Sequence, residues 1–315
     1  MQRVNDITKL SSELLEKDIY SAVVLGNFDG VHLGHQKLFE IAGQYKDELM
    51  VIAFSFYPHP TWVLGHQPKQ LIASREEKFQ KIKQLGITTF VEYPFTTEIS
   101  KLTPEEFFKQ ILVEKLHTKV VIVGSNYYFG KDQEGDISHL KNFGKKYGVE
   151  IRIIKEVKEE DTTISSTAIR QFIQDGEIEK AKQYLGEYFS ISGEVVHGKE
   201  LGRTIGFRTA NITPEKYRIY PPNGVYATQI QVGNKIFYGM TNIGFNPTVD
   251  GEKKVIETHI FGFKSDIYGK HIIVTFLKYI RPEKKFESLE ALINQLKHDK
   301  IYIQNFFNIE ENGVN

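Results

Sequence analysis

Short apolar runs alternate with longer amphipathic segments between residues 21 and 185. The apolar runs are rich in β-branched residues and lack a clean alternation with polar ones, which is typical of strands buried on both faces. The predicted strands are Ser21–Leu25, Met50–Phe56, Ile87–Tyr93, Lys119–Val123 and Val149–Ile154. Strands that alternate with helices predict a doubly wound α/β domain with a parallel sheet, whose ligands bind at the carboxyl ends of the strands.

The segments between these strands carry the signals of helices. Apolar residues recur at helical spacing between residues 38 and 45. Capping boxes begin at Ser74 and at Thr103, the second with Pro104 at the first helical position. Gly86 lies where the helix that begins near Ser74 should end.

After Leu185 the pattern becomes strand-rich, with turn sequences between the strands. The strand-like segments include Lys235–Gly239, Val255–Phe261 and His271–Tyr279, and one helix is predicted near Ser288–His298. This pattern predicts a small antiparallel β-barrel or sandwich with a C-terminal helix. We therefore expect two domains, residues 1–186 and 187–315, without a Pro- or Ser-rich linker between them.

Composition narrows the classes of function. The 315 residues include 40 Lys and Arg against 40 Asp and Glu, so the formal net charge is zero. Neither half has the basic excess that binding to a nucleic-acid backbone requires. The absence of cysteine excludes disulfides, Cys-ligated zinc, iron–sulfur clusters and thiolate nucleophiles. The start, MQRVNDITKL, is too polar for a signal peptide, and no apolar run approaches the roughly 20 residues of a membrane span. We expect a cytoplasmic protein with no membrane partner.

The first chemical signal is the stretch GNFDGVHLGH at residues 26–35, directly after the first predicted strand. Glycines let a ligand approach the backbone, and the following helix start offers unpaired N–H groups, so a phosphate site is indicated. His32 and His35 could each donate a hydrogen bond to one phosphate chain. Taken alone, H-x-x-H is more often a pair of surface histidines, and no third ligand beside them indicates zinc.

Three further segments follow predicted strands of the same sheet, namely FYPHP at 56–60, GSNYYFG at 124–130 and ISSTAIR at 164–170. The last one offers hydroxyl and N–H groups at a helix start, with Arg170 one turn further on, which indicates a second anion site or simple N-capping. The aromatic run at 127–129, taken alone, favours a core position. Because all four segments lie on the carboxyl side of strands, we expect them to share one site.

A second Gly-rich stretch, GRTIGFRTAN at residues 202–211, lies in the strand-rich half. It lacks the G-x-x-x-x-G-K-[ST] pattern of a Walker loop. Its closely spaced glycines, together with Thr209 and Asn211, could hold phosphates and a metal ion.

Together these motifs resemble those of the bacterial bifunctional riboflavin kinase/FMN adenylyltransferases, also called FAD synthetases. The resemblance covers nearly the whole chain, from GNFDGVHLGHQKL through F-x-PHP, G-x-N-x-x-FG and ISSTxIR to the kinase signature GR-x-x-GF-P-TAN. It implies that ATP phosphorylates riboflavin to FMN and adenylylates FMN to FAD, with release of pyrophosphate. It also implies Mg²⁺ on the ATP phosphates.

The resemblance further implies roles for individual residues. Catalysis is implied for His32, His35, Arg170 and Glu257, the last as the general base toward the riboflavin 5′-hydroxyl. By charge statistics alone, Glu257 would be a solvated strand residue. Contacts to ATP or its phosphates are implied for Gly26, Asn27, Phe28, Gly34, Ser166, Thr167, Gly202, Arg203 and Gly206. Flavin contacts are implied for Asp29, Phe56, His59, Asn126 and Arg281, and metal contacts for Thr209 and Asn211.

Three positions depart from the family pattern. Asn126 is Asp in many relatives, Arg208 stands where Pro is usual, and Gly262 stands where Asp often follows the strand. Without the fixed φ of proline, the segment that presents Thr209 is less constrained. Two alternatives therefore stay open: an adenylyltransferase whose kinase domain is weak or only binds flavin, and a non-catalytic flavin-binding regulator.

Overall fold

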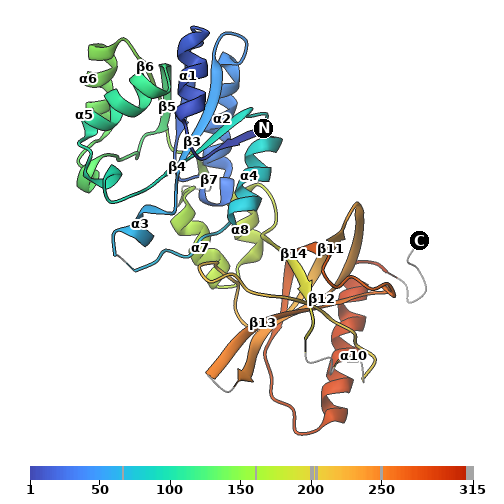
Figure 1. Ribbon diagram of the computed structural model, residues 1–315. Helices are drawn as coiled ribbons and strands as arrows, with labels where there is room; N and C mark the ends of the chain where they lie inside the picture. Colours follow the sequence, from blue (N-terminus) through green and yellow to red (C-terminus); the bar gives the residue numbers. More distant parts are fainter. Residues whose placement is uncertain (66, 160–161, 199–201, 203–204, 249–250, 310–315) are drawn as a thin grey trace. The chain divides into compact units, whose positions relative to one another are not determined.

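The computed structural model (Figure 1) describes residues 1–65, 67–159, 162–198, 202, 205–248 and 251–309. Its contacts divide the chain into two compact units, Met1–Ser166 and Thr167–Asn315. The first unit contains a parallel α/β sheet and the second a closed antiparallel barrel. Both predicted architectures are confirmed, and the barrel decides between the two forms expected for the second half.

The first unit is built on a six-stranded sheet in the order β1-β4-β3-β2-β5-β6, with parallel pairing throughout. The strands are β1 (Gln2–Val4), β2 (Ser21–Leu25), β3 (Met50–Tyr57), β4 (Thr89–Pro94), β5 (Thr118–Gly124) and β6 (Glu150–Ile154). The order reverses between β2 and β5, and such a switch point opens a crevice at the carboxyl ends of the strands. All five predicted strands are confirmed. Strand β1 was not predicted, because its three residues carry no recognisable pattern.

Helices cover both faces of this sheet. They are α1 (Thr8–Glu16), α2 (Leu33–Ala42), α3 (Pro60–Val63), α4 (Arg75–Gln84), α5 (Pro104–Glu106), a π-helical segment at Phe107–Lys115, and α6 (Ile137–Tyr147). One buried cluster joins a face of the sheet to α1, the π-helical segment and α6, and the other joins the opposite face to α2 and α4. The strands β7 (Lys158–Glu159) and β8 (Thr162–Thr163) form a separate antiparallel pair.

The predicted helix signals act as expected. Ser74 and Glu77 exchange side-chain and backbone hydrogen bonds at the start of α4, and Thr103 and Glu106 do the same at the start of α5. Gly86 follows α4 with φ of +82°, a left-handed conformation that glycine adopts without strain. These local bonds fix where α4 begins, and α4 lies beside the candidate site.

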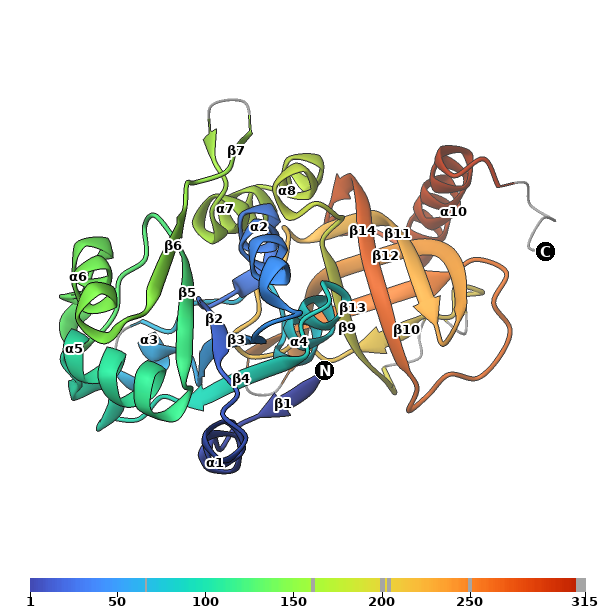
Figure 2. The ribbon, with the colours of Figure 1, turned by 90° about the horizontal axis from the view of Figure 1, so that it is seen from above.

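The second unit is a barrel in the order β10-β13-β12-β11-β14-β9, seen in Figure 2 beside α10. Its strands are β9 (Ser190–Val196), β10 (Ala210–Ile212), β11 (Gly224–Val232), β12 (Lys235–Thr248), β13 (Gly251–Ile260) and β14 (His271–Pro282). Its helices are α7 (Ser166–Gln174), α8 (Ile178–Leu185) and α10 (Leu289–Phe306). The predicted strands and the predicted C-terminal helix are present, and the helix extends beyond its predicted end.

Polar and apolar side chains share the barrel interior. The buried hydroxyls of Thr228, Thr241 and Thr258 lie on three neighbouring strands and form a chain of hydrogen bonds of 2.9 Å each. Because each hydroxyl has a partner, the cost of burying it is offset. Outside the barrel, Ile303 of α10 belongs to one core cluster with Val225 and Met240, so α10 covers part of the outer face.

The position of the domain boundary can be tested with fragments. The predicted boundary follows residue 186, whereas α7 and α8 cluster with the barrel, and α8 packs against β14. We expect residues 187–315 to fold alone, and residues 167–315 to be more stable by at least about 2 kcal/mol, because α8 buries apolar side chains worth about 1.5–3 kcal/mol each. Urea unfolding of both fragments measures the difference. Equal stabilities would show that α8 contributes nothing to the barrel, and an unfolded short fragment would disprove the boundary at 186.

Candidate active sites

A large cavity opens at the carboxyl end of the parallel sheet. Its volume is about 800 Å³, and it lies wholly within the first unit. The lining includes nine residues singled out from the sequence, namely Gly26, Asn27, Gly34, His32, His35, Phe56, His59, Asn126 and Ser166. Four separate motifs thus meet in one site, as the parallel sheet predicts.

The two histidines lie at the start of α2. His32 is the N-cap residue, and its Nδ1 accepts a hydrogen bond of 3.4 Å from the backbone N–H of His35. The two rings stack with centroids 3.6 Å apart. A ring nitrogen that accepts a hydrogen bond carries no proton, so His32 holds its proton on Nε2. Both imidazoles therefore stand at a helix N-terminus, where anions are favoured.

The charge state of His35 follows from its surroundings. Burial, the neighbouring His32 and the ammonium of Lys78 all hold the pKa of His35 well below its usual value of 6.5. Its Nδ1 is buried without a hydrogen-bond partner among the described residues. At neutral pH His35 is a neutral imidazole, which can donate one hydrogen bond to a ligand in the cavity.

Side chains pack tightly against two glycines, Gly26 in the loop before α2 and Gly34 in the first turn of α2. A Cβ on Gly26 would lie 2.7 Å from the ring of Phe28, and one on Gly34 would lie 3.1 Å from the ring of His32. Phe28 itself is fully buried and left-handed, with φ of 51°. It supports the loop from behind and is absent from the cavity lining.

Asp29 also lies outside the lining. Its buried Oδ1 accepts hydrogen bonds from the backbone N–H groups of Ile72 (2.8 Å) and Ala73 (3.3 Å). These bonds tie the loop after β2 to the segment that leads into α4. Its predicted flavin contact stays a prediction, beside a structural role that the sequence did not reveal.

The remaining motifs approach the cavity from other strand ends. Phe56 is the last residue but one of β3, and His59 caps α3 by accepting a hydrogen bond of 3.3 Å from the N–H of Thr61. The hydroxyl of Ser166 donates to the backbone carbonyl of Asp29 at 3.0 Å, which links ISSTAIR to the first loop. Thr167 and Arg170 belong to the second unit, so their approach to this cavity stays a prediction.

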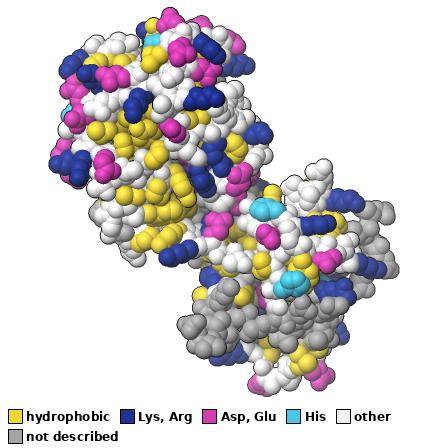
Figure 3. Space-filling model, in the orientation of Figure 1, with side chains coloured by type: hydrophobic (Ala, Val, Ile, Leu, Met, Phe, Trp, Pro, Cys, Tyr) yellow, Lys and Arg dark blue, Asp and Glu magenta, His cyan; other side chains and the backbone are white. Residues whose placement is uncertain are grey.

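Hydrophobic side chains gather on the face of the first unit seen in Figure 3.

The second candidate site follows from the register of the barrel strands. Asn211 of β10 lies opposite Glu257 of β13, and Glu257 lies opposite Asn242 of β12. Cross-strand partners share one face of a sheet, so these three polar residues form a row. Thr258, the next residue along β13, is buried among the interior threonines, which places the row on the outer face of the barrel.

Thr209 and Asn211 line a cavity of about 230 Å³ together with Arg208. Gly202 is required at its place because a Cβ there would lie 2.2 Å from the carbonyl oxygen of Phe207. Gly206 has φ of +80°. Arg203 lies outside the described residues.

His259 is a residue that the sequence analysis did not single out. Its Nδ1 lies 2.8 Å from the backbone carbonyl oxygen of Arg208, the residue before Thr209. Burial lowers the pKa of His259, so the ring is neutral and Nδ1 carries the proton that it donates. The sequence offered one signal that His259 could belong to the site. It follows Glu257 by two residues, and residues two apart share one face of a strand.

The two departures in the kinase half have visible consequences. The hydrogen bond from His259 restrains the backbone at Arg208, which proline would restrain through its ring. Gly262 has φ of +67°, in the left-handed region that favours glycine over other residues. Both positions are therefore held in defined conformations.

Arg281 is engaged in an ion pair. Its Nε lies 3.0 Å from both carboxylate oxygens of Asp299, and its second terminal nitrogen lies 2.7 Å from one of them. The Asp299 side chain is only 4% exposed. This bidentate pair joins β14 to α10. The predicted flavin contact of Arg281 stays a prediction.

Among the described residues, no group of three or more His, Asp or Glu side chains is placed to hold a metal ion. The candidate metal residues Thr209 and Asn211 offer a hydroxyl and an amide oxygen. No helix in the described part of the chain is long and apolar enough to cross a membrane.

Two family models match the chain. The model for FAD synthetase matches residues 15–168, and the model for riboflavin kinase matches residues 185–307. Among curated proteins, the bifunctional riboflavin kinase/FMN adenylyltransferase of Buchnera aphidicola is 36% identical over 93% of this chain and 95% of its own. The enzyme of the same name from Escherichia coli K12 is 37% identical over 91% of this chain and 93% of its own.

A solved structure is also similar over the whole chain. The crystal structure of a Streptococcus pneumoniae protein named as a macrolide-efflux protein has a TM-score of 0.83 and 34% identity, and the match covers 96% of this chain and 98% of that one. That name applies to the pneumococcal protein. The assignment of this chain rests on the family models and the curated relatives.

The role of the Arg281–Asp299 pair can be measured. We expect Arg281→Met to lower the free energy of unfolding by about 3–5 kcal/mol, because it leaves a buried carboxylate unpaired. Arg281→Met with Asp299→Leu should recover most of that loss. Urea unfolding gives both values, and riboflavin titration of the double variant shows whether Arg281 also contacts flavin. A loss below about 1 kcal/mol in the single variant would contradict the structural role.

Proposed function

Because the chain belongs to the family of bifunctional riboflavin kinase/FMN adenylyltransferases, we propose which of its residues carry each of the two reactions. The protein is an enzyme of flavin cofactor biosynthesis, with a kinase activity on riboflavin and an adenylyltransferase activity on FMN. The parallel α/β unit is matched by the FAD synthetase model and the barrel by the riboflavin kinase model. The proposal therefore concerns roles within each site.

In the first unit, an oxygen of the FMN phosphate attacks the α-phosphorus of ATP. The bond between the α-phosphorus and the bridging oxygen breaks, pyrophosphate leaves with that oxygen, and FAD forms. A phosphate is already a nucleophile, so positioning and stabilisation of charge are the tasks of the protein. His32 and the neutral His35 donate hydrogen bonds to the departing pyrophosphate, and the family resemblance adds Thr167 and Arg170 as further phosphate ligands. The stacked pair at the N-terminus of α2 is the observation that carries this assignment.

The flavin occupies the other side of the same cavity. Phe56 and His59 offer ring faces for an aromatic ligand, and the Asn126 amide can hydrogen-bond a flavin ring edge. Many family members have Asp at position 126. The amide of Asn126 brings no charge to the flavin ring. The cavity volume of about 800 Å³ lies within the range of small-molecule and cofactor sites.

In the second unit, Glu257 takes the proton of the riboflavin 5′-hydroxyl as this oxygen attacks the γ-phosphorus of ATP, and ADP leaves. The strand register that sets Asn211 opposite Glu257 supports this role, because it places the base beside a residue proposed to bind the phosphate end of ATP. The restraint of Arg208 by His259 favours a working kinase over a flavin-binding remnant.

The side-chain oxygens of Thr209 and Asn211 suit a Mg²⁺ ion that is held mainly by the phosphates of ATP. Mg²⁺ prefers oxygen ligands and usually keeps several waters while it binds substrate phosphates, so the hydroxyl of Thr209 and the amide oxygen of Asn211 fit it without a carboxylate cage. When bound, it neutralises charge on the phosphates. A cytoplasmic location and the absence of a nucleic-acid partner also stay proposals, supported by the lack of cysteine and the balanced charge.

The role of the histidine pair is tested by His32→Ala and His35→Ala. We expect each to slow FAD formation from FMN by about a hundred- to thousandfold, because one preorganised donor typically contributes roughly 2.7–4 kcal/mol to the transition state. Riboflavin phosphorylation by the same chain should persist, and His139→Ala, an exposed histidine of α6, should leave both rates unchanged. Parental FAD formation in either site variant would remove the pair from the mechanism.

The role of Glu257 is tested by Glu257→Gln. The amide keeps the shape but cannot accept the proton, so phosphorylation of riboflavin should fall by about 10²–10⁴-fold while adenylylation of FMN persists. Chromatography of flavins at saturating ATP and magnesium measures both rates. Glu194→Gln, an exposed carboxylate of β9, is the matched control. Unchanged phosphorylation in Glu257→Gln would leave the kinase site without a named base.

A further inference from the structure

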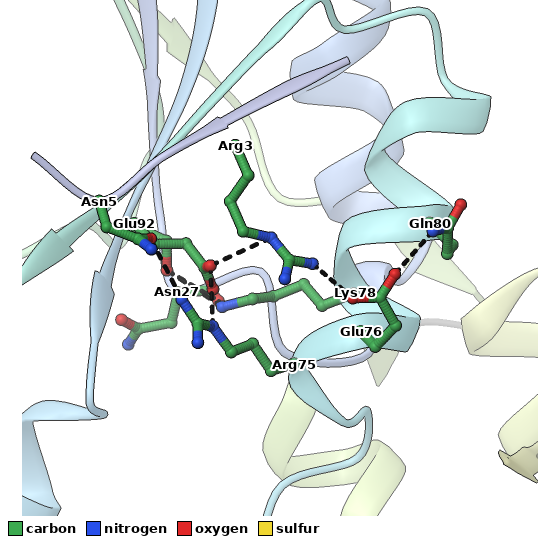
Figure 4. A network of polar contacts seen from close by, with 9 residues as sticks. Arg3, Asn5, Asn27, Arg75, Glu76, Lys78, Gln80 and Glu92 are labelled. Atoms are coloured by element: carbon green, nitrogen blue, oxygen red, sulfur yellow. Dashed lines mark hydrogen bonds and ion pairs between the residues drawn. The ribbon is translucent and has the colours of Figure 1, made fainter. Parts of the chain in front are cut away.

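A lysine contacts the loop that follows β2 in the first unit. Lys78 of α4 directs its ammonium toward the backbone carbonyl of Asn27 at 3.4 Å and the hydroxyl of Ser55 at 3.3 Å (Figure 4). Ser55 also donates to the same carbonyl at 3.4 Å. Asn27 and Ser55 both line the large cavity. One cation thus connects the loop after β2 with the neighbouring strand β3.

An ion-pair network around Glu92 lies near the ammonium of Lys78 (Figure 4). Glu92 of β4 has a side chain that is 0% exposed, and its Oε2 lies 2.9 Å from Nε of Arg75 and 3.4 Å from Nε of Arg3 (Figure 4). Burial lowers the pKa of Lys78, while the carboxylates of Glu92 and Asp29 act in the opposite direction. Strands β1 and β4 and helix α4 therefore supply a fixed frame for the lysine.

The same frame reaches the second motif of the site. The guanidinium of Arg75 lies 4.2 Å from the ring centroid of Tyr57, which precedes the Pro58-His59 segment. Arg75 also donates to the side-chain oxygen of Asn5 at 3.1 Å. Helix α4 thus contacts the Asn27 loop through Lys78 and the end of β3 through Arg75, although neither cation belongs to one of the four motifs predicted to form the site.

We propose that Lys78 is a positioning residue for adenylyl transfer, which holds the carbonyl of Asn27 and thereby sets the loop that leads to His32 and His35. The inference rests on the assignment of adenylyl transfer to this cavity. A shift of this loop displaces the hydrogen-bond donors from the phosphates, and small displacements of preorganised groups slow a reaction strongly. Lys78 acts through Asn27 and does not itself touch the reacting atoms.

Lys78→Met tests the proposal, because Met keeps most of the unbranched side chain and lacks the ammonium donor. We expect kcat for FAD formation to fall by about tenfold or more, with KM for FMN within about threefold and riboflavin phosphorylation unchanged. Lys83→Met removes an exposed lysine from the same helix and should change neither rate. Glu77→Ala breaks the capping box of α4 and controls for loss of helix stability.

Two outcomes would overturn the proposal. One is a kcat for FAD formation within twofold of the parent in Lys78→Met, and the other is an equal fall in kcat in Glu77→Ala at the same loss of melting temperature. If Lys78→Met does not fold, Lys78→Arg decides, since it keeps the positive charge beside Glu92 but replaces the compact ammonium by a longer, planar guanidinium, which changes the geometry of the contact with the Asn27 carbonyl. A parental rate in folded Lys78→Arg would then refute the role.

The failure of this inference is distinct from the failure of the site assignment. If His32→Ala loses FAD formation and Lys78→Met does not, only the role of Lys78 is wrong. If His32→Ala keeps the parental rate, the cavity is not the site of adenylyl transfer, and the role of Lys78 is refuted with it.

Discussion

The parallel pairing of β2 with β3 on one side and β5 on the other is the constraint on which the adenylyltransferase site depends. Parallel strands bring all their carboxyl ends to one edge, so the loops after β2, β3 and β5 meet there although they are far apart in the chain. The switch in strand order between β2 and β5 opens the crevice. The N-terminus of helix α2 carries His32 and His35, and both line the cavity at that edge of the sheet, where a helix N-terminus favours anions.

The kinase site depends on a different constraint, the closed barrel. Closure fixes the register between β10, β13 and β12, and this register alone aligns Asn211, Glu257 and Asn242. The interior side of the same strands is satisfied by its own hydroxyl chain and needs no ligand. The two candidate sites thus bring together residues that are distant in sequence in two different ways: converging strand ends in the sheet and aligned strand faces in the barrel.

Charged residues outside the cavity lining connect the loop after β2 to its neighbours. Asp29 accepts a hydrogen bond that joins the loop after β2 to the segment before α4, and Lys78 connects the same loop to β3. Glu92 is buried, and its carboxylate forms ion pairs with Arg3 and Arg75. These ion pairs offset the free-energy cost of burying its charge. This arrangement gives the loop a support that does not depend on a bound ligand.

The sequence by itself determined five of the six strands of the sheet, the helix after the first of them, the helix starts at Ser74 and Thr103, and the motifs that meet in the large cavity. It could do so because periodicity, capping and Gly-rich turns are local properties of the chain. It did not reveal β1, whose three residues form a strand only by pairing with β4, nor His259, Lys78 and the Arg281–Asp299 pair. Only the tertiary structure decided these, because each depends on a partner that is brought near by folding and leaves no pattern in the neighbouring sequence.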